Sequence, residues 1–198
     1  MRRVKFIRNP QASDFGNNVE EFLNTLGGPA CFYIDGVDDS RTRALITLLH
    51  GNEPSGVMAF HRWLRCGARP AVNIVCIIAS VTAALEPTLF AHRTLPRARD
   101  LNRCFKPPFD DAQGALAEEI LEILHLHHPE AVVDMHNTSG SGPSFGVCTH
   151  MDRHHEALVS LFTQRLIVSS LRMGALMDIS EDHYPTVTVE VGGRLAVS

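Results

Sequence analysis

Apolar residues along the chain fall into short runs that polar segments separate. Five of the runs are rich in β-branched residues and have the length of buried strands. They cover residues 31–34, 44–49, 72–78, 131–135 and 187–191. Three other segments, residues 54–66, 113–126 and 153–166, carry apolar positions at helical spacing, and the first opens with a proline in its first turn.

Continuous apolar strands that alternate with amphipathic helices predict an α/β fold. We expect a mixed, largely parallel central sheet flanked by helices. No repeat, low-complexity tract or Pro/Gly-rich linker divides residues 1–198, so we expect a single domain. In such folds ligands bind beyond the carboxyl ends of the strands, and the residues after each strand are the first candidates for chemistry.

The composition of the chain excludes some classes of binding partner. With 18 basic and 22 acidic residues, the net charge of −4 lacks the basic excess that nucleic acid binding requires. The longest apolar stretch, residues 71–85, is interrupted by Asn73, Ser80 and Thr82 and is too short to span a membrane. No apolar segment follows the basic N-terminus as in a signal peptide, which predicts a cytoplasmic protein with its five cysteines reduced. The composition is compatible with either a monomer or a homo-oligomer.

Two of the predicted strands end at a histidine. Residues 44–49 lead into His50, with Glu53 three positions later, and residues 131–135 lead into His136. Imidazole and carboxylate ligands suit Zn²⁺, and catalytic zinc sites use about three protein ligands and keep one position open for water. We therefore predict one zinc ion per chain, bound by His50, Glu53 and His136.

The same H-x-x-E spacing occurs a second time, at His127 and Glu130. That pair follows the predicted helix 113–126, where histidines interact favourably with the helix C-terminus without any metal. We expect the second pair to be structural, because only His50 and Glu53 lie between a buried strand and a helix.

Four arginines lie within residues 93–103, in a chain with only two lysines. A solvated basic loop is the simpler interpretation. A guanidinium group, however, binds a carboxylate through two parallel hydrogen bonds, and Asn102 beside Arg103 adds an amide donor. This favours a pocket for a small anionic substrate.

Glu190 is a lone carboxylate in the apolar run that contains residues 187–191. A buried charge without a partner is costly. Glu190 either forms a structural ion pair with an arginine, or lies at the end of the strand as a carboxylate base.

Together these segments resemble the succinylglutamate desuccinylase and aspartoacylase family, which has a zinc carboxypeptidase-like (phosphorylase/hydrolase-like) fold. The resemblance rests on four motifs, in this order: His50-Gly51-Asn52-Glu53, Asp100-Leu101-Asn102-Arg103-Cys104-Phe105, Asp134-Met135-His136-Asn137-Thr138 and Val189-Glu190-Val191-Gly192. It implies that His50, Glu53 and His136 bind zinc and that Glu190 is the general base. It also implies that Asn102 and Arg103 hold the carboxylate of the substrate.

The family also uses an arginine to polarise the scissile carbonyl, and here its usual position falls on Leu95. Arg93, Arg97 and Arg99 are the alternatives, and Arg93 is favoured. The sequence ends eight residues after Glu190, so the C-terminal β domain of full-length relatives is expected to be absent. Another histidine group, His150, His154 and His155, matches no family motif and is expected to be a solvated helix start.

The implied activity is zinc-dependent hydrolysis of the amide bond of an N-acyl amino acid. Two alternatives remain. One is a carboxypeptidase that acts on short peptides, and the other is a zinc-containing carboxylate-binding module with little turnover.

Overall fold

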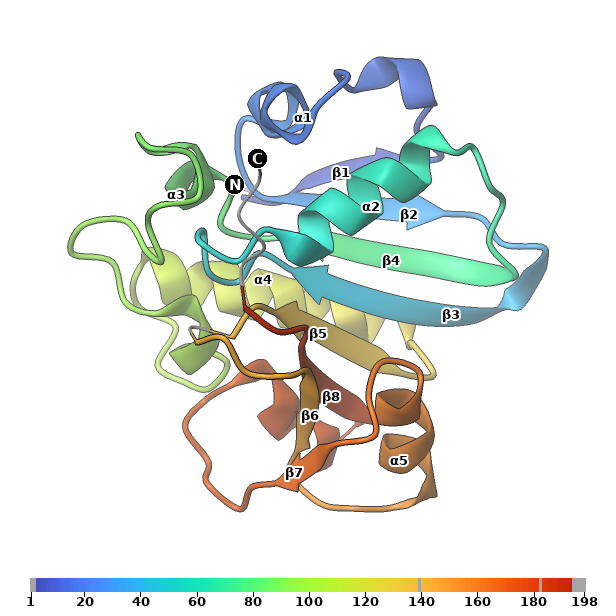
Figure 1. Ribbon diagram of the computed structural model, residues 1–198, viewed down its shortest axis with the longest axis vertical. Coiled ribbons are helices and arrows are strands. Elements are labelled where there is room, and N and C mark those ends of the chain that lie inside the picture. Colours follow the sequence, from blue (N-terminus) through green and yellow to red (C-terminus); the bar gives the residue numbers. More distant parts are fainter. Residues whose placement is uncertain (1–2, 139, 182, 194–198) are drawn as a thin grey trace.

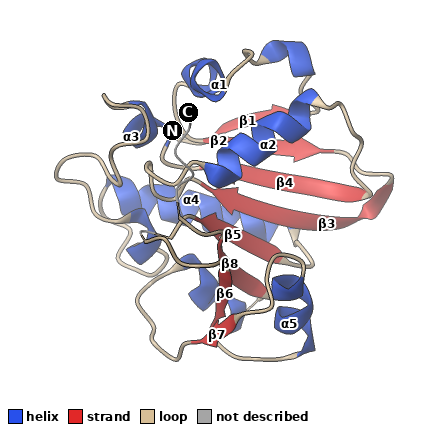
Figure 2. Cartoon of the chain, viewed as in Figure 1, coloured by secondary structure: helices blue, strands red, loops and turns tan. Residues whose placement is uncertain are grey.

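The computed structural model describes residues 3–138, 140–181 and 183–193. Within them, eight strands form one sheet with helices on both of its faces (Figures 1 and 2). The strands are β1 Lys5–Arg8, β2 Ala30–Ile34, β3 Asp38–Thr47, β4 Val72–Ile78, β5 Val132–His136, β6 Phe145–Cys148, β7 Leu166–Val168 and β8 Thr186–Glu190. The helices are α1 Val19–Leu26, α2 Ser55–Arg65, α3 Val81–Leu85, α4 Ala112–His127 and α5 Arg153–Ser160, and short 3-10 turns cover Ala12–Asp14, Leu101–Arg103 and Leu176–Glu181.

The strand order across the sheet is β1-β2-β4-β3-β5-β8-β6-β7. Only β2 with β4 and β6 with β8 pair antiparallel in the described part of the chain, and the other neighbours run parallel. This confirms the predicted mixed, largely parallel sheet. The parallel strands β3, β5 and β8 are neighbours, so their carboxyl ends lie together at one edge of the sheet.

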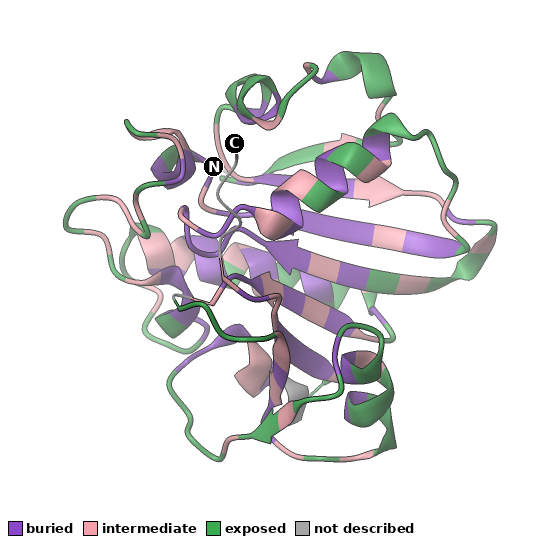
Figure 3. Ribbon diagram, in the orientation of Figure 1, coloured by how far each residue is buried: buried purple, intermediate pink, exposed green. Residues whose placement is uncertain are grey.

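Each face of the sheet packs against its own helices. α4 covers one face, where Leu116, Ile120 and Leu124 contact side chains such as Ile46 and Ile77. α1 and α2 cover the other face over β2 and β4. α5 packs over β6 and β8 through Val159. Figure 3 shows the resulting layer of buried strands between partly exposed helices.

Helix α5 is shorter than the sequence predicted. Its last residue is Ser160, and residues 166–168, which the predicted helix entered, form the edge strand β7. The chain turns at Thr163, whose side-chain hydroxyl donates to the carbonyl oxygen of Ser144 at 2.9 Å. This tertiary contact ends the helical pattern. Strand β3, in turn, begins six residues earlier than predicted and ends at Thr47.

No helix within the described residues is both long enough and apolar enough to cross a membrane.

Candidate metal and substrate site

Three neighbouring strands and the loops after them carry the candidate residues to one place. His50 follows β3, His136 is the last residue of β5, and Glu190 is the last residue of β8. His136 and Glu190 are partners in the β5–β8 register, so they lie side by side on the same face of the sheet. Glu53 comes from the turn between His50 and α2.

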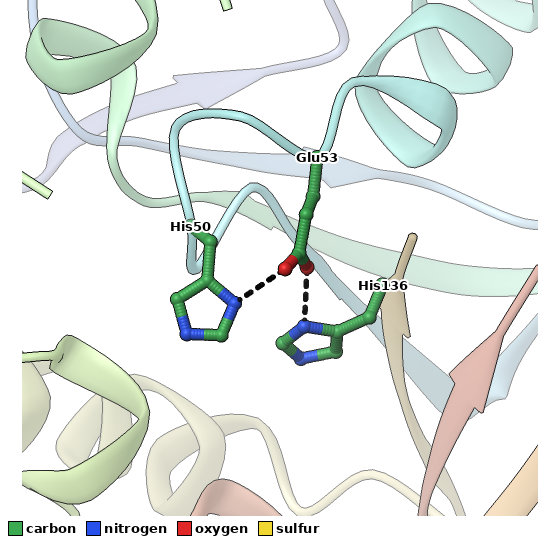
Figure 4. A group of neighbouring side chains, drawn as sticks. All are labelled: His50, Glu53 and His136. Carbon is green, nitrogen blue, oxygen red and sulfur yellow. Dashed lines mark hydrogen bonds and ion pairs between the residues drawn. The ribbon is translucent and has the colours of Figure 1, made fainter. Parts of the chain in front are cut away.

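His50, Glu53 and His136 form a compact buried cluster (Figure 4). Nδ1 of His50 lies 2.9 Å from one carboxylate oxygen of Glu53, and Nδ1 of His136 lies 2.6 Å from the other. The three side chains are at most 8% exposed. One ligand atom from each residue lies within 4.8 Å of the others, as a single metal ion requires.

Both histidines are held at their opposite ring nitrogen by a carboxylate. Nε2 of His50 is 2.8 Å from Asp100, and Nε2 of His136 is 2.7 Å from Asp134. Metal-binding histidines commonly make this contact, which fixes the tautomer and directs the other nitrogen toward the ion. Nε2 of His50 also lies 2.7 Å from a guanidinium nitrogen of Arg93, but it cannot both donate and accept a hydrogen bond. We assign its proton to the contact with Asp100, because this leaves Nδ1 free to coordinate.

The contacts within the cluster favour the charged forms of Glu53 and His136. Burial alone would raise the pKa of Glu53, but hydrogen bonds from His136 and His50 outweigh it and lower the pKa to about 2. Burial lowers the pKa of His136, yet Asp134 and Glu53 raise it well above its usual value. An ionised carboxylate between two imidazoles is a donor set that suits Zn²⁺, because a bound divalent ion takes the place of the imidazole protons. The residues present therefore fit the metal that the sequence predicted.

The seven residues that the sequence analysis assigned to the site line one cavity of about 290 Å³. They are His50, Glu53, Arg93, Asn102, Arg103, His136 and Glu190. The cavity is also lined by Asn137, Thr138, Phe145 and Thr188.

Of the three candidate arginines, the structure brings Arg93 to this cavity. Its guanidinium group donates to Glu53 at 3.2 Å and to Asp100 at 3.0 Å. Arg99 instead forms a two-point ion pair with Asp111, with distances of 2.5 and 2.7 Å. Arg97 is exposed and does not line the cavity.

Asn102 is buried and Arg103 is exposed at the cavity. The side-chain oxygen of Asn102 accepts a hydrogen bond from the backbone of Leu176 at 2.9 Å, which leaves its amide nitrogen to donate. The guanidinium group of Arg103 donates to the backbone carbonyl oxygen of Asn102 at 2.6 Å. Both side chains are thus positioned by the turn Leu101–Arg103.

Glu190 has no arginine partner among the described residues, which do not include Arg194. Its Oε2 is buried without a hydrogen-bond partner in the described structure. Burial raises the pKa of Glu190, although nearby His136 acts in the opposite direction. A carboxylate with an unused oxygen beside the candidate metal ligands is suited to accept a proton.

The second H-x-x-E pair does not form a metal cluster. Glu130 pairs with Arg41 and Arg43, while the ring of His127 stacks on Tyr33 with centroids 4.9 Å apart. These contacts support the structural interpretation of the pair.

Sequence reasoning assigned no role to Asp100 and Asp134, which orient the two histidines. Asp134 carried the same signal as Glu190, since it is a lone carboxylate in an apolar strand, two positions before a candidate ligand. It is fully buried, and burying a charge there requires a partner such as His136.

Comparison with known proteins identifies the family of the chain. Residues 40–198 match the succinylglutamate desuccinylase/aspartoacylase catalytic domain. The chain belongs to this family. The match confirms the resemblance inferred from the four motifs, and it covers every candidate site residue. No curated protein matches the chain in sequence.

Several solved structures share the fold. Succinylglutamate desuccinylase from Vibrio cholerae superposes with a TM-score of 0.72 at 18% identity, over 94% of this chain and 66% of that one. A succinylglutamate desuccinylase from Silicibacter sp. TM1040 gives 0.66 at 18% identity, over 83% and 54%. The ectoine utilization protein EutE (DoeB) from Ruegeria pomeroyi gives 0.63 at 19% identity, over 81% and 52%. The chain thus spans about half to two thirds of these structures.

Proposed function

We propose that the chain is a zinc-dependent hydrolase that cleaves the amide bond of a small anionic N-acyl amino acid. The observation that carries the proposal is the single cavity in which a buried His-Glu-His cluster, an unpartnered carboxylate and two arginines meet. Membership of the family supports the same class of reaction.

His50, Glu53 and His136 would hold the metal ion, and Asp100 and Asp134 would keep the two imidazoles in the coordinating tautomer. When bound, zinc lowers the pKa of a coordinated water toward about 7 and acts as a Lewis acid on the carbonyl group.

Glu190 is the general base. It stands beside His136 at the end of the neighbouring strand, and its free Oε2 accepts the proton of the attacking water. Burial raises the pKa of Glu190 toward neutral pH. A carboxyl group whose pKa is closer to the working pH can both accept and donate a proton. Glu190 then donates that proton to the departing amine.

Arg93 stabilises the negative charge that develops on the carbonyl oxygen. Its guanidinium group lies against Glu53 and so carries a fixed positive charge next to the reacting atoms. Preorganised donors of this kind each contribute about 2.7 to 4 kcal/mol to catalysis in well-studied enzymes.

Asn102 and Arg103 bind the carboxylate of the substrate. Arg103 offers a planar fork of donors and Asn102 a buried amide, a combination that fits a carboxylate better than a neutral group. The cavity of about 290 Å³ is at the small end of ligand sites, which supports a single acylated amino acid as substrate.

The proposal is tested by measuring zinc content and then activity against N-succinyl amino acids, N-acetyl amino acids and dipeptides. We expect zinc-dependent release of the amine from one of the N-acyl series. Preferred hydrolysis of dipeptides would instead identify a carboxypeptidase, and tight binding of an N-acyl amino acid without turnover would identify a binding module.

Replacing His50 with alanine should remove zinc from this site, because the other two ligands alone bind far more weakly. His127→Ala is the matched control, since His127 belongs to the other H-x-x-E pair and stacks on Tyr33. Loss of that zinc ion in His127→Ala, with retention in His50→Ala, would show that the wrong pair had been chosen.

A further inference from the structure

A second group of metal-ligating side chains lies outside the proposed active site. His150, Asp152 and His155 come together where the loop after β6 enters α5. Because β6 runs antiparallel to β8, its first residue, Phe145, pairs with Glu190 and its carboxyl end points to the opposite edge of the sheet. The group is therefore remote from the His50 cluster.

The sequence predicted a solvated helix start here, and the structure corrects part of that prediction. α5 does begin at Arg153, but His155 is only 1% exposed. The side chains of His150 and Asp152 are about half exposed, at 45% and 41%. The group thus has one buried member and an opening to solvent.

The contacts within the group leave one carboxylate oxygen directed at a histidine. Oδ1 of Asp152 accepts from the backbone nitrogens of His154 and His155 and lies 2.8 Å from Nδ1 of His155. Oδ2 lies 3.6 Å from Nε2 of His150, and Nδ1 of His150 contacts the hydroxyl of Thr149 at 3.1 Å. The two imidazole rings are 4.4 Å apart between centroids.

The distance of 3.6 Å between Oδ2 of Asp152 and Nε2 of His150 fits two ligands of one metal ion better than a direct hydrogen bond. Two ligands bonded at about 2.0 to 2.2 Å to a tetrahedral zinc ion lie roughly 3.3 to 3.6 Å from each other. One ligand atom from each of the three side chains lies within 4.8 Å of the others. The cap hydrogen bonds occupy Oδ1, so Oδ2 keeps its lone pairs for an ion.

We propose that His150, Asp152 and His155 form a second divalent-metal site, selective for zinc-like ions. Two imidazoles and one carboxylate suit zinc and neighbouring transition metals rather than Ca²⁺ or Mg²⁺, which prefer all-oxygen sites. The three ligands leave a position for water. The ion ties the loop of residues 149–152 to α5, and through Val159 to the part of the sheet formed by β6 and β8.

The test compares zinc content in two matched variants after equilibrium dialysis against zinc. His150→Gln removes a half-exposed ligand, and His154→Gln removes the neighbouring exposed histidine that stands outside the group. We expect His150→Gln to bind one zinc ion fewer per chain than His154→Gln, which should match the wild type. Asp152→Asn retains the cap oxygen but should also lose one ion. Equal zinc content in His150→Gln and His154→Gln would overturn the proposal.

A second readout separates this site from the proposed active site. In the His50→Ala background, adding zinc should raise the melting temperature, because ligand binding to the folded state stabilises it. The shift should vanish in His50→Ala/His150→Gln and persist in His50→Ala/His154→Gln. If the shift survives in both double variants, the second site is contradicted. Failure of the active-site proposal is a different result, because it would appear as unchanged zinc content in the His50→Ala single variant.

Discussion

Single side chains at the end of β8 and in the turn Leu101–Arg103 decide the proposed chemistry. Glu190→Gln preserves shape and removes the proton acceptor. We expect kcat to fall about 10²- to 10⁴-fold, as for the loss of other general bases, with zinc content and melting temperature unchanged. Glu118→Gln, an exposed position on α4, is the control. Preserved activity with a large drop in melting temperature would show that Glu190 is structural.

The proposed binding of the substrate carboxylate by Asn102 and Arg103 can be tested at Arg103 without loss of charge. Arg103→Lys keeps the positive charge but loses the planar pair of donors, so KM for an anionic substrate should rise about tenfold or more. Arg97→Lys changes an exposed arginine of the same loop that does not line the cavity, and KM should stay constant. If KM for every carboxylate-bearing substrate is the same in both variants, Arg103 does not bind the substrate carboxylate.

Between elements, the close approach of α2 to β3 and β5 sets the position of Glu53. Gly56 lies in the first turn of α2, and a Cβ there would stand 2.1 Å from Oγ1 of Thr47 and 3.2 Å from the sulfur of Met135. Gly56→Ala should therefore push the start of α2 away from the sheet at a cost of about 1 to 3 kcal/mol. The gain in helix propensity is at most about 1 kcal/mol and does not compensate.

The Gly56→Ala variant should melt several degrees lower, since about 1 kcal/mol corresponds to roughly 2 to 4 °C for a chain of this size. It should also bind zinc more weakly, because Glu53 precedes the displaced turn. Gly28→Ala is the control, as a Cβ at Gly28 meets no atom within 4 Å. Normal melting of Gly56→Ala would show that Thr47 relaxes without moving α2.

Elements with a full apolar run were predictable from the sequence, and those at the margins were not. β4 was predicted with its observed bounds, because its residues are buried between two helical layers. β1 was missed, since it is an edge strand with charged and exposed positions. α1 was also missed, although Asn18 caps its first turn and Gly27, at φ 68°, ends it. Those two capping residues were the available signal.

At the scale of the whole molecule, Glu130 links two distant segments through charge. It accepts hydrogen bonds from Arg41 at 2.8 and 3.0 Å and from Arg43 at 2.6 Å, which ties the start of β3 to the loop before β5. Burial opposes ionisation, but hydrogen bonds and charge attraction from the two arginines together outweigh it and lower the pKa of Glu130 below its usual 4.5.

A carboxyl group with a lowered pKa in the folded state contributes stability above its unfolded pKa, and this contribution is lost as the pH falls through the folded pKa. Glu130→Gln should therefore lower the melting temperature at pH 7 and have little effect at an acidic pH below the folded pKa of Glu130. All three side chains are about a third to a half exposed, so the expected loss is about 1 kcal/mol or less and shrinks at high salt. An equal effect at both pH values would exclude the ion pairs as its source.

The location of the site followed from sequence because chemistry-bearing residues came directly after apolar strands. His50, His136 and Glu190 fell at the ends of three strands that the structure places side by side. The choice among Arg93, Arg97 and Arg99 depended on the path of an irregular loop, in which Asp111 binds Arg99. No local pattern encodes such a contact. The supporting roles of Asp100 and Asp134 likewise depend on which ring nitrogen faces them.

The pairing of His136 with Glu190 across β5 and β8 also determines which changes of chain length the molecule tolerates. Side chains of a strand alternate between the two faces, so a shift of β8 by one residue turns every side chain to the opposite face. An inserted residue in the connection before β8 can be absorbed where it occurs. Glu190 lies on the α4 side of the sheet, as His136 does. The same insertion between Thr186 and Glu190 would turn the carboxylate to the side that α2 and α5 cover, so the fold tolerates insertions at positions where the proposed active site does not.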